Sequence, residues 1–219
     1  LPALEYALYA DDAQGLIARG EDAGRFRCDY AIAVAANLER LAREIDSAWN
    51  DAGVYARELA RPAPQNILWR NDGEVATEVL KALSTALHVA RDQKLQPPLG
   101  EDAASARASL LPLQRSALTA RYLLAGIEAI SRLHAAGRFA ASLPEDSRWI
   151  DSGITEELQR VREDFDELGM PVDRAVADES RRELLVHAAL LLANVRAMVD
   201  EYLAPALGVN LGFNSLDGD

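Results

Sequence analysis

Apolar residues recur at spacings of three and four along most of this 219-residue chain, and this spacing constrains the fold more than any other feature. The clearest example lies between residues 22 and 50, with the residues Val34, Leu38, Leu41, Ile45 and Trp49. Similar stripes occupy residues 71–94, 115–136, 155–168 and 178–203. Such spacing places apolar side chains on one face of an α-helix. Because no segment alternates with a period of two for long enough to form a strand, we predict an all-α protein of antiparallel helices packed as bundles.

Interruptions between the stripes predict the domain organisation. A short apolar helix is expected over residues 2–10, where Pro2 suits the first turn. Residues 51–70 are expected to be irregular, the sequence Pro97-Pro98-Leu99-Gly100 to break the helical pattern, and residues 101–113 to be a linker or a short helix. Two helical-bundle domains resembling four-helix bundles follow. Residues 1–100 form the C-terminal part of an incomplete first bundle, and residues 101–219 form the second.

Charge and composition exclude some classes of function. The chain has 23 basic and 35 acidic residues, giving a net charge of −12. Such a chain repels phosphate backbones, so we expect no nucleic-acid partner. No stretch reaches the roughly 18 apolar residues that a membrane-spanning helix needs, so no transmembrane segment is expected in this chain. Cys28 is the sole cysteine and cannot form an internal disulfide; we expect it to pack as a small buried residue.

Carboxylates at the two ends of the chain are candidate metal ligands. Glu5 lies in the first predicted helix, and Asp217 and Asp219 lie two apart in the C-terminal segment. Carboxylates brought together favour hard cations such as Ca²⁺, Mg²⁺ or Fe³⁺. The alternatives are a solvated Glu5 and a turn in which the aspartates accept hydrogen bonds from their own backbone.

Other polar residues give weaker signals. The three histidines lie within long predicted helices with no two of them three or four apart, so we expect packing or boundary roles for His88, His134 and His187. The sequence contains no His-Glu-x-x-His, Cys-x-x-Cys, Gly-x-Ser-x-Gly or phosphate-binding glycine motif. Arg115 and Ser116 open the third long predicted helix, where Ser116 could cap the helix and Arg115 could bind an anion or a carboxylate.

Five segments in order resemble motifs of the imelysin-like family of bacterial envelope proteins. Leu1–Glu5 resembles the family's Gly-x-His-x-x-Glu helix from its second position, and the C-terminal GFNSLDGD, residues 212–219, resembles its closing segment. The other three segments are Arg27-Cys28-x-Tyr30, Lys94-Leu95 with Pro98-Leu99-Gly100, and Arg115-Ser116. The resemblance covers nearly the whole chain.

The resemblance implies a fold and a cellular context. Imelysin-like proteins are helical, contain two related bundle domains and are associated with iron acquisition. They are exported with a signal peptide or a lipoprotein anchor, so the resemblance implies a periplasmic protein or an outer-membrane lipoprotein. It also implies that a long upstream segment, including the leader, is missing from this chain. The motif segments of the family gather in a cleft between the domains.

One departure from the family pattern concerns catalysis. Pro2 stands where the family motif has its histidine, and proline cannot ligate a metal, although the glutamate is retained as Glu5. We therefore expect a non-catalytic protein of iron uptake, which binds a metal ion or a small polar ligand in the interdomain cleft. The expected metal is iron or another divalent or trivalent cation, held by Glu5, Asp217 and Asp219. The expected ligand-binding residues are Glu5, Arg27, Arg115, Ser116, Asn214 and Ser215.

Two alternative functions follow from the same resemblance. The first is a metallopeptidase of the imelysin type, which the family name suggests. The second is a scaffold protein of the cell envelope with a protein partner, in which the motif residues only hold the two domains together.

Overall fold

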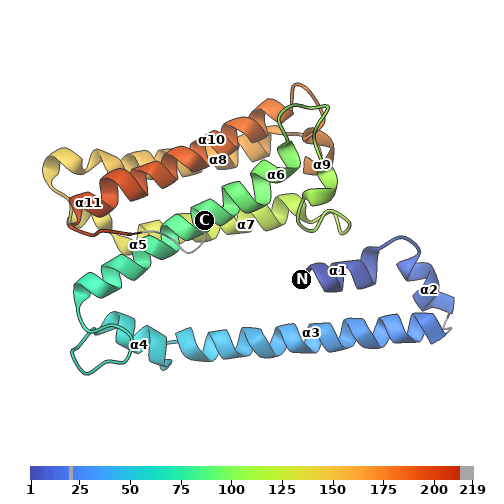
Figure 1. The fold of residues 1–219 in the computed structure, drawn as a ribbon, viewed down its shortest axis with the longest axis horizontal. Coiled ribbons are helices and arrows are strands. Elements are labelled where there is room, and N and C mark those ends of the chain that lie inside the picture. Colours follow the sequence, from blue (N-terminus) through green and yellow to red (C-terminus); the bar gives the residue numbers. More distant parts are fainter. Residues whose placement is uncertain (20–21, 213–219) are drawn as a thin grey trace. The chain divides into compact units, whose positions relative to one another are not determined.

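The structure is a computed structural model, and it describes residues 1–19 and 22–212 (Figure 1). The described residues are helical and contain no strand, which confirms the predicted all-α class. The chain forms two compact units. The first unit consists of residues 1–72 with 115–118, and the second consists of residues 73–114 with the chain from 119 onward. The predicted boundary after residue 100, between an incomplete first bundle and a second bundle, stays a prediction.

The first unit contains four helices that bury only small residues. These are α1 (Pro2–Tyr9), α2 (Ala13–Arg19), α3 (Asp22–Trp49) and α4 (Val54–Ala60). Pro2 occupies the first turn of α1 as predicted. The expectation of an irregular segment over 51–70 is wrong in part, because α4 forms there from good helix formers. The described side chains that are buried in this unit belong to alanines, such as Ala7 and Ala31.

The second unit carries the large hydrophobic core. Its α-helices are α5 (Asp72–His88), α6 (Gln96–Leu99), α7 (Thr119–Gly137), α8 (Trp149–Glu167), α9 (Val172–Ala175), α10 (Arg182–Ala197) and α11 (Ala204–Ala206). Two π-helical segments, Val89–Leu95 and Met198–Leu203, continue α5 and α10. Three short 3₁₀ turns cover Ala108–Leu110, Phe139–Ala141 and Glu145–Ser147. The most extensive helix pair is α8 with α10, which run side by side in Figure 1.

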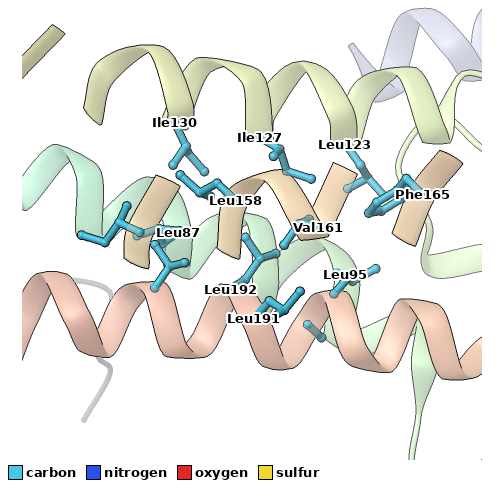
Figure 2. Close-up of a cluster of buried hydrophobic side chains, with 14 of the residues drawn as sticks. Leu87, Leu95, Leu123, Ile127, Ile130, Leu158, Val161, Phe165, Leu191 and Leu192 are labelled. Atoms are coloured by element: carbon cyan, nitrogen blue, oxygen red, sulfur yellow. The ribbon is translucent and has the colours of Figure 1, made fainter. Parts of the chain in front are cut away.

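The core lies between the four long helices of this unit, as in a four-helix bundle (Figure 2). Each helix contributes residues three or four apart, as its apolar stripe predicts. The labelled core residues are Leu87, Leu95, Leu123, Ile127, Ile130, Leu158, Val161, Phe165, Leu191 and Leu192. Each fully buried Leu, Ile or Val stabilises the fold by roughly 1.5–3 kcal/mol relative to an exposed one. Among the described residues, no helix is both long and apolar enough to span a bilayer.

Two predicted helix boundaries were wrong for reasons of backbone geometry. The third long helix begins at Thr119 instead of Arg115, because Leu113 and Ala117 have φ of 53° and 57° and interrupt the helical path. The helical path also continues through Pro97 and Pro98, which fall in the first turn of α6, where proline is tolerated. It ends at Gly100, which has φ of 60°.

Two further helix starts differ from the prediction. The helix expected from residue 155 begins at Trp149. The helix expected from Asp178 begins at Arg182. The Asp178 carboxylate instead organises the preceding turn, where its Oδ1 accepts the N–H groups of Ser180 and Arg181 at 3.1 and 2.9 Å. These hydrogen bonds hold the pKa of Asp178 below its usual value.

Candidate functional site

Four of the predicted site residues lie in the first unit and gather around Tyr6. Glu5 comes from α1, Arg27 from α3, and Arg115 and Ser116 from the turn that precedes α7. The other predicted residues, Asn214, Ser215, Asp217 and Asp219, lie outside the described residues, so their predicted roles stay predictions. We call the group of Glu5, Tyr6, Arg27, Arg115 and Ser116 the Tyr6 cluster.

Glu5 is bound twice by Ser116. Its Oε1 accepts the Ser116 backbone N–H at 2.8 Å and the Ser116 hydroxyl at 2.9 Å. The predicted helix cap at Ser116 is therefore wrong, because Ser116 precedes the helix and donates to a carboxylate 111 residues away in the sequence. The half-buried Glu5 carboxylate joins α1 to the turn that contains Ser116. Glu5 is therefore not a solvated residue, and its Oε1 already has hydrogen-bond partners.

The turn that Glu5 holds has a strained backbone. Leu113 and Ala117 flank Arg115 and Ser116, and both have the left-handed conformation that side chains with a Cβ rarely adopt. Such residues cost about 1 kcal/mol each and persist where surrounding contacts determine them. Strained backbone of this kind is frequent at ligand-binding sites. The two hydrogen bonds to Glu5 are contacts that can maintain this conformation.

Two guanidinium groups lie near the same aromatic ring. The Cζ atoms of Arg115 and Arg27 are 5.5 and 5.9 Å from the centre of the Tyr6 ring, within the range of cation–π attraction. Arg27 also makes long hydrogen bonds to the carbonyl oxygens of Tyr6 and Ala7, at 3.5 and 3.4 Å. With two arginines and one glutamate, the cluster has a formal charge of +1 in a chain of net charge −12. Its chemistry therefore suits an anion better than a cation.

The comparison with protein families agrees with the motifs. The imelysin family model matches residues 1–199. The chain belongs to the imelysin family. No significant match to a curated protein or to a solved structure was found. The Tyr6 cluster lies within the span that matches the imelysin model.

The described part of this imelysin-family chain does not by itself form a metal site. Among residues 1–19 and 22–212, no three His, Cys, Asp or Glu side chains are placed so that they could hold a metal ion. The Tyr6 cluster supplies one carboxylate, Glu5, and one of its oxygens is already hydrogen-bonded to Ser116. Hard cations need several oxygen ligands at once. The predicted metal set of Glu5, Asp217 and Asp219 therefore depends on residues that the structure does not describe.

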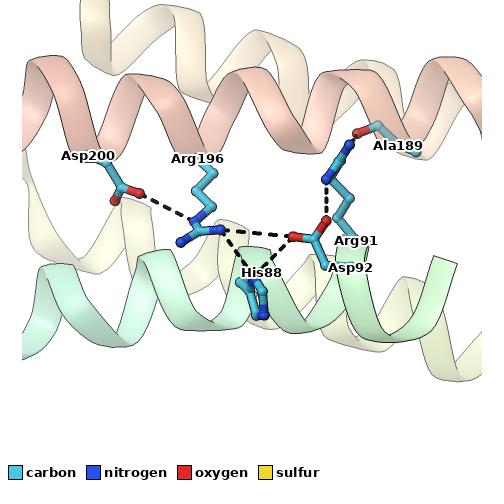
Figure 3. Close-up of polar contacts among 6 residues, drawn as sticks. All are labelled: His88, Arg91, Asp92, Ala189, Arg196 and Asp200. Carbon is cyan, nitrogen blue, oxygen red and sulfur yellow. Dashed lines mark hydrogen bonds and ion pairs between the residues drawn. The ribbon is translucent and has the colours of Figure 1, made fainter. Parts of the chain in front are cut away.

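A second polar cluster, in the second unit, was missed by the sequence analysis (Figure 3). His88, Arg91 and Asp92, at the end of α5 and in the following π-helical segment, face Arg196 and Asp200 of α10 and its extension. His88 Nδ1 lies 3.1 Å from Asp92 Oδ2 and 3.0 Å from Arg196 Nη1. His88 Nδ1 can donate to Asp92 or accept from Arg196, but it cannot do both at once.

A further contact of this cluster joins the two helices, and another lies within α10 and its extension. Arg91 Nε donates to the Ala189 carbonyl at 3.2 Å, and Arg196 Nε lies 3.3 Å from Asp200. The spacings His88–Asp92 and Arg196–Asp200 are both i,i+4, which is a sequence signal for paired side chains on one helix face. The pairing between the helices has no such signal. The formal charges of two arginines and two aspartates cancel, so the cluster joins α5 to α10 without offering an unbalanced charge to a ligand.

The other two histidines also pair with aspartates in the second unit. His187 Nδ1 lies 2.9 and 3.1 Å from the two oxygens of Asp164. His134 is buried, and its Nε2 lies 3.2 Å from Asp151 Oδ1 without the alignment of a hydrogen bond. Burial lowers the pKa of His134, and the nearby Asp151 charge only partly opposes this effect. Burial likewise raises the pKa of Glu157 on α8.

Proposed function

We propose that this imelysin-family protein binds an anionic small ligand at the Tyr6 cluster and acts in iron uptake by binding an iron-bearing anion, without catalysis. The observation that supports this proposal is that the acidic and the basic residues of the cluster have different contacts. Ser116 engages the Glu5 carboxylate, while Arg27 and Arg115 place two positive charges around the exposed Tyr6 ring. Arginine guanidinium groups bind carboxylates and phosphates through paired hydrogen bonds.

The proposal of a non-catalytic role depends on Pro2 and Glu5. In the family motif the histidine and the glutamate are three apart on one helix and could hold a metal together. Here the first of these positions is Pro2, and the second is Glu5, whose Oε1 accepts two hydrogen bonds. A carboxylate that fixes a turn is less available as a metal ligand or as a base. The envelope location, as a periplasmic protein or an outer-membrane lipoprotein, belongs to the same proposal, and the only support for it is the family.

Direct binding of a metal ion is the alternative form of this proposal. In that form Glu5 would use its second oxygen, Oε2, and Asp217 and Asp219 would complete the site. The chemistry of three carboxylates suits Fe³⁺ or a divalent hard cation. The two forms differ in what binds, because an iron chelate with excess negative charge needs the arginines and a bare cation is repelled by them.

A ligand titration separates the two forms. We would measure binding of ferric citrate, of citrate alone and of an iron(III) salt by calorimetry, for the wild-type chain and for an Arg27→Gln/Arg115→Gln variant. The anionic-ligand form predicts at least a tenfold weaker affinity for ferric citrate in the variant. Arg43→Gln is the control, because Arg43 is an exposed arginine of α3 that pairs with Glu39. Unchanged binding in the arginine double variant, or no binding of ferric citrate to the wild type, would overturn this form.

A structural role for the cluster has one observation in its favour, the pair of hydrogen bonds between Glu5 and Ser116. If the cluster only holds α1 against the turn before α7, Glu5→Ala lowers the melting temperature, and neither citrate nor iron raises it in the wild type. A bound ligand instead raises the melting temperature with its concentration.

A further inference from the structure

An open groove of about 610 Å³ lies on the second unit, between the N-terminal half of α10 and the loop that follows α6. Two aliphatic side chains of α10, Val186 and Leu190, line this groove and are 46% and 55% exposed. Because they are four residues apart, they lie on one face of the helix. Single exposed hydrophobic residues are common on protein surfaces, but a pair within a groove is a surface that a partner can cover.

Hydrogen bonds fix both sides of this groove. The buried guanidinium group of Arg182 on α10 donates to the carbonyl oxygens of Leu99 and Gly100, so the end of α6 lies beside the start of α10 (Figure 1). In the loop after α6, the Ser105 N–H donates to Asp102 Oδ1 at 2.8 Å, and the Asp102 N–H donates to Ser105 Oγ at 3.0 Å. A groove with ordered sides binds a partner at a lower entropic cost than one that must form on binding.

The groove is acidic. Four of its lining residues are acids, namely Glu101, Asp102, Glu179 and Glu183. Arg182 contributes one positive charge, so with His187 neutral the formal charge of the lining residues is −3. The charged residues that directly adjoin them in the sequence, Asp178 and Arg181, cancel. Even with Arg107, the next basic residue of the loop, the charge remains −2, so its sign does not depend on where the groove is taken to end.

Three of these carboxylates are unpaired in the described part of the chain. No hydrogen bond or ion pair with a described residue involves the side chains of Glu101, Glu179 and Glu183. The hydrogen bonds from Ser105, by contrast, hold the pKa of Asp102 below its usual value. Glu183 lies in the first turn of α10, where a negative charge is favourable, but Glu101 comes from the loop after α6. Like charges that gather from separate segments repel one another, and a cationic partner removes this repulsion.

Three kinds of occupant fit this groove poorly. A metal ion needs several ligands at once, and no three His, Cys, Asp or Glu side chains of the described residues are placed to hold one. Nucleic acids and anionic lipids are repelled by the acids. A second copy of the chain is also repelled, because each copy has a net charge of −12. The negative charge and the aliphatic pair together match a basic partner with apolar side chains.

We propose that the groove docks a short basic segment of a partner protein, in which lysine or arginine side chains flank one or two aliphatic side chains. The basic side chains pair with Glu101, Glu179 and Glu183, and the aliphatic ones cover Val186 and Leu190. Such charge pairs set selectivity and the rate of association, and the apolar contact adds affinity. The groove shares no residue with the Tyr6 cluster, so this docking is independent of the proposed anion binding.

The test uses the 219-residue chain and fluorescently labelled peptides. A short peptide of alternating lysine and leucine is the probe, and fluorescence anisotropy measures its binding. We expect binding that weakens with rising salt, and about tenfold weaker binding of a lysine–serine peptide that lacks the leucines. A glutamate–leucine peptide should not bind, because its charges have the same sign as those of the groove.

Two variants test whether the peptide binds in the groove. Glu179→Gln/Glu183→Gln removes two of the unpaired carboxylates and should bind the lysine–leucine peptide about tenfold more weakly than the wild type. Val186→Ser/Leu190→Ser removes the aliphatic pair and should also bind it about tenfold more weakly. All four side chains are exposed, so both variants should fold, and circular dichroism would verify that their helices are kept.

Each variant has a matched control outside the groove. Glu156→Gln/Asp166→Asn removes two exposed acids of α8 that do not line the groove, so it changes the net charge by the same amount. Ile67→Ser/Leu68→Ser removes two exposed aliphatic side chains of the first unit. Both control variants should bind the lysine–leucine peptide as the wild type does.

Several outcomes would overturn the proposal. These are no binding of the lysine–leucine peptide, equal binding of the lysine–serine peptide, and equal losses in the groove variants and their controls. Displacement of the peptide by an equal concentration of spermidine would also overturn it, because the groove would then be a site for small cations. A dimer of the chain that Val186→Ser/Leu190→Ser dissociates would overturn it as well, since a second copy would then be the occupant.

Discussion

Helix α3 of the first unit and helix α10 of the second have similar apolar patterns but different surroundings. On α3 the stripe includes Leu41, Ile45 and Trp49, which are 40%, 63% and 49% exposed. On α10 the residues Leu185 and Leu192 are at most 1% exposed. The spacing of apolar residues therefore predicts a helix and the face that can be buried. It does not predict whether enough neighbouring helices are present to bury that face.

This difference separates two ways in which the units are held together. The second unit has four long helices around a continuous core of Leu, Ile and Val. The first unit buries alanines, and polar contacts such as Glu5 with Ser116 join segments that are distant in the sequence. Hydrophobic burial is the larger stabilising contribution per residue, so mutations should affect the two units differently.

The largest effect is expected from truncating a core residue of the second unit. Leu192→Ala should lower the free energy of unfolding by about 2–5 kcal/mol, because the surrounding helices cannot collapse fully onto the cavity. Ile45→Ala on α3 is the matched change in the first unit and should cost less than about 0.5 kcal/mol, since Ile45 is already largely in water. Urea unfolding followed by circular dichroism measures both. Equal losses for the two variants would show that the α3 stripe is buried in solution.

A second large effect is expected at the buried arginine of the second unit. Arg182 is 8% exposed and donates to the carbonyl oxygens of Leu99, Val176 and Gly100. Arg182→Met should cost about 2–4 kcal/mol, because it leaves these carbonyls without a charged donor. Arg181→Met is the control, since Arg181 is less buried and donates to one carbonyl, that of Glu167. Similar urea midpoints for the two variants would contradict the role of Arg182 in holding the α6 terminus.

The sequence predicted the helical class and the apolar faces of the second unit, because these depend on spacing within a single segment. It also placed Arg115, Ser116 and Glu5 among the candidate site residues through the family motifs. It could not predict that Ser116 binds Glu5, because the contact joins residues 111 positions apart through a turn with left-handed Leu113 and Ala117. Neither of these residues is a glycine, so the local sequence gave no sign of such a turn.

The buried histidine of the second unit predicts a dependence of stability on pH. Burial lowers the pKa of His134 in the folded state below its usual value of about 6.5. Below about pH 6.5, the unfolded chain therefore binds a proton at His134 that the folded chain does not bind. Stability should therefore fall as the pH is lowered from 6.5, with a slope of at most about 1.4 kcal/mol per pH unit from this group. Urea midpoints at several pH values measure the slope.

A variant separates this histidine from other titrating groups. His134→Gln should show a smaller loss of stability between pH 6.5 and 5 than the wild type. The raised pKa of Glu157 has the opposite effect on stability, because at Glu157 the folded chain holds a proton that the unfolded chain releases. The relevant quantity is therefore the difference in the loss of stability between the wild type and His134→Gln. Parallel pH profiles for the wild type and His134→Gln would contradict the prediction.

A smaller effect than those in the core is expected in the first unit, at the hydroxyl of Ser116. Ser116→Ala removes the Oγ hydrogen bond to Glu5 but keeps the one from the backbone N–H, and it should cost about 0.5–1.5 kcal/mol. Ser47→Ala is the control, because the Ser47 hydroxyl donates to the Glu44 carbonyl within the exposed part of α3. If polar contacts rather than a core hold the first unit together, Ser116→Ala destabilises it more than Ile45→Ala does. The reverse order would mean that the α3 stripe is the main source of its stability.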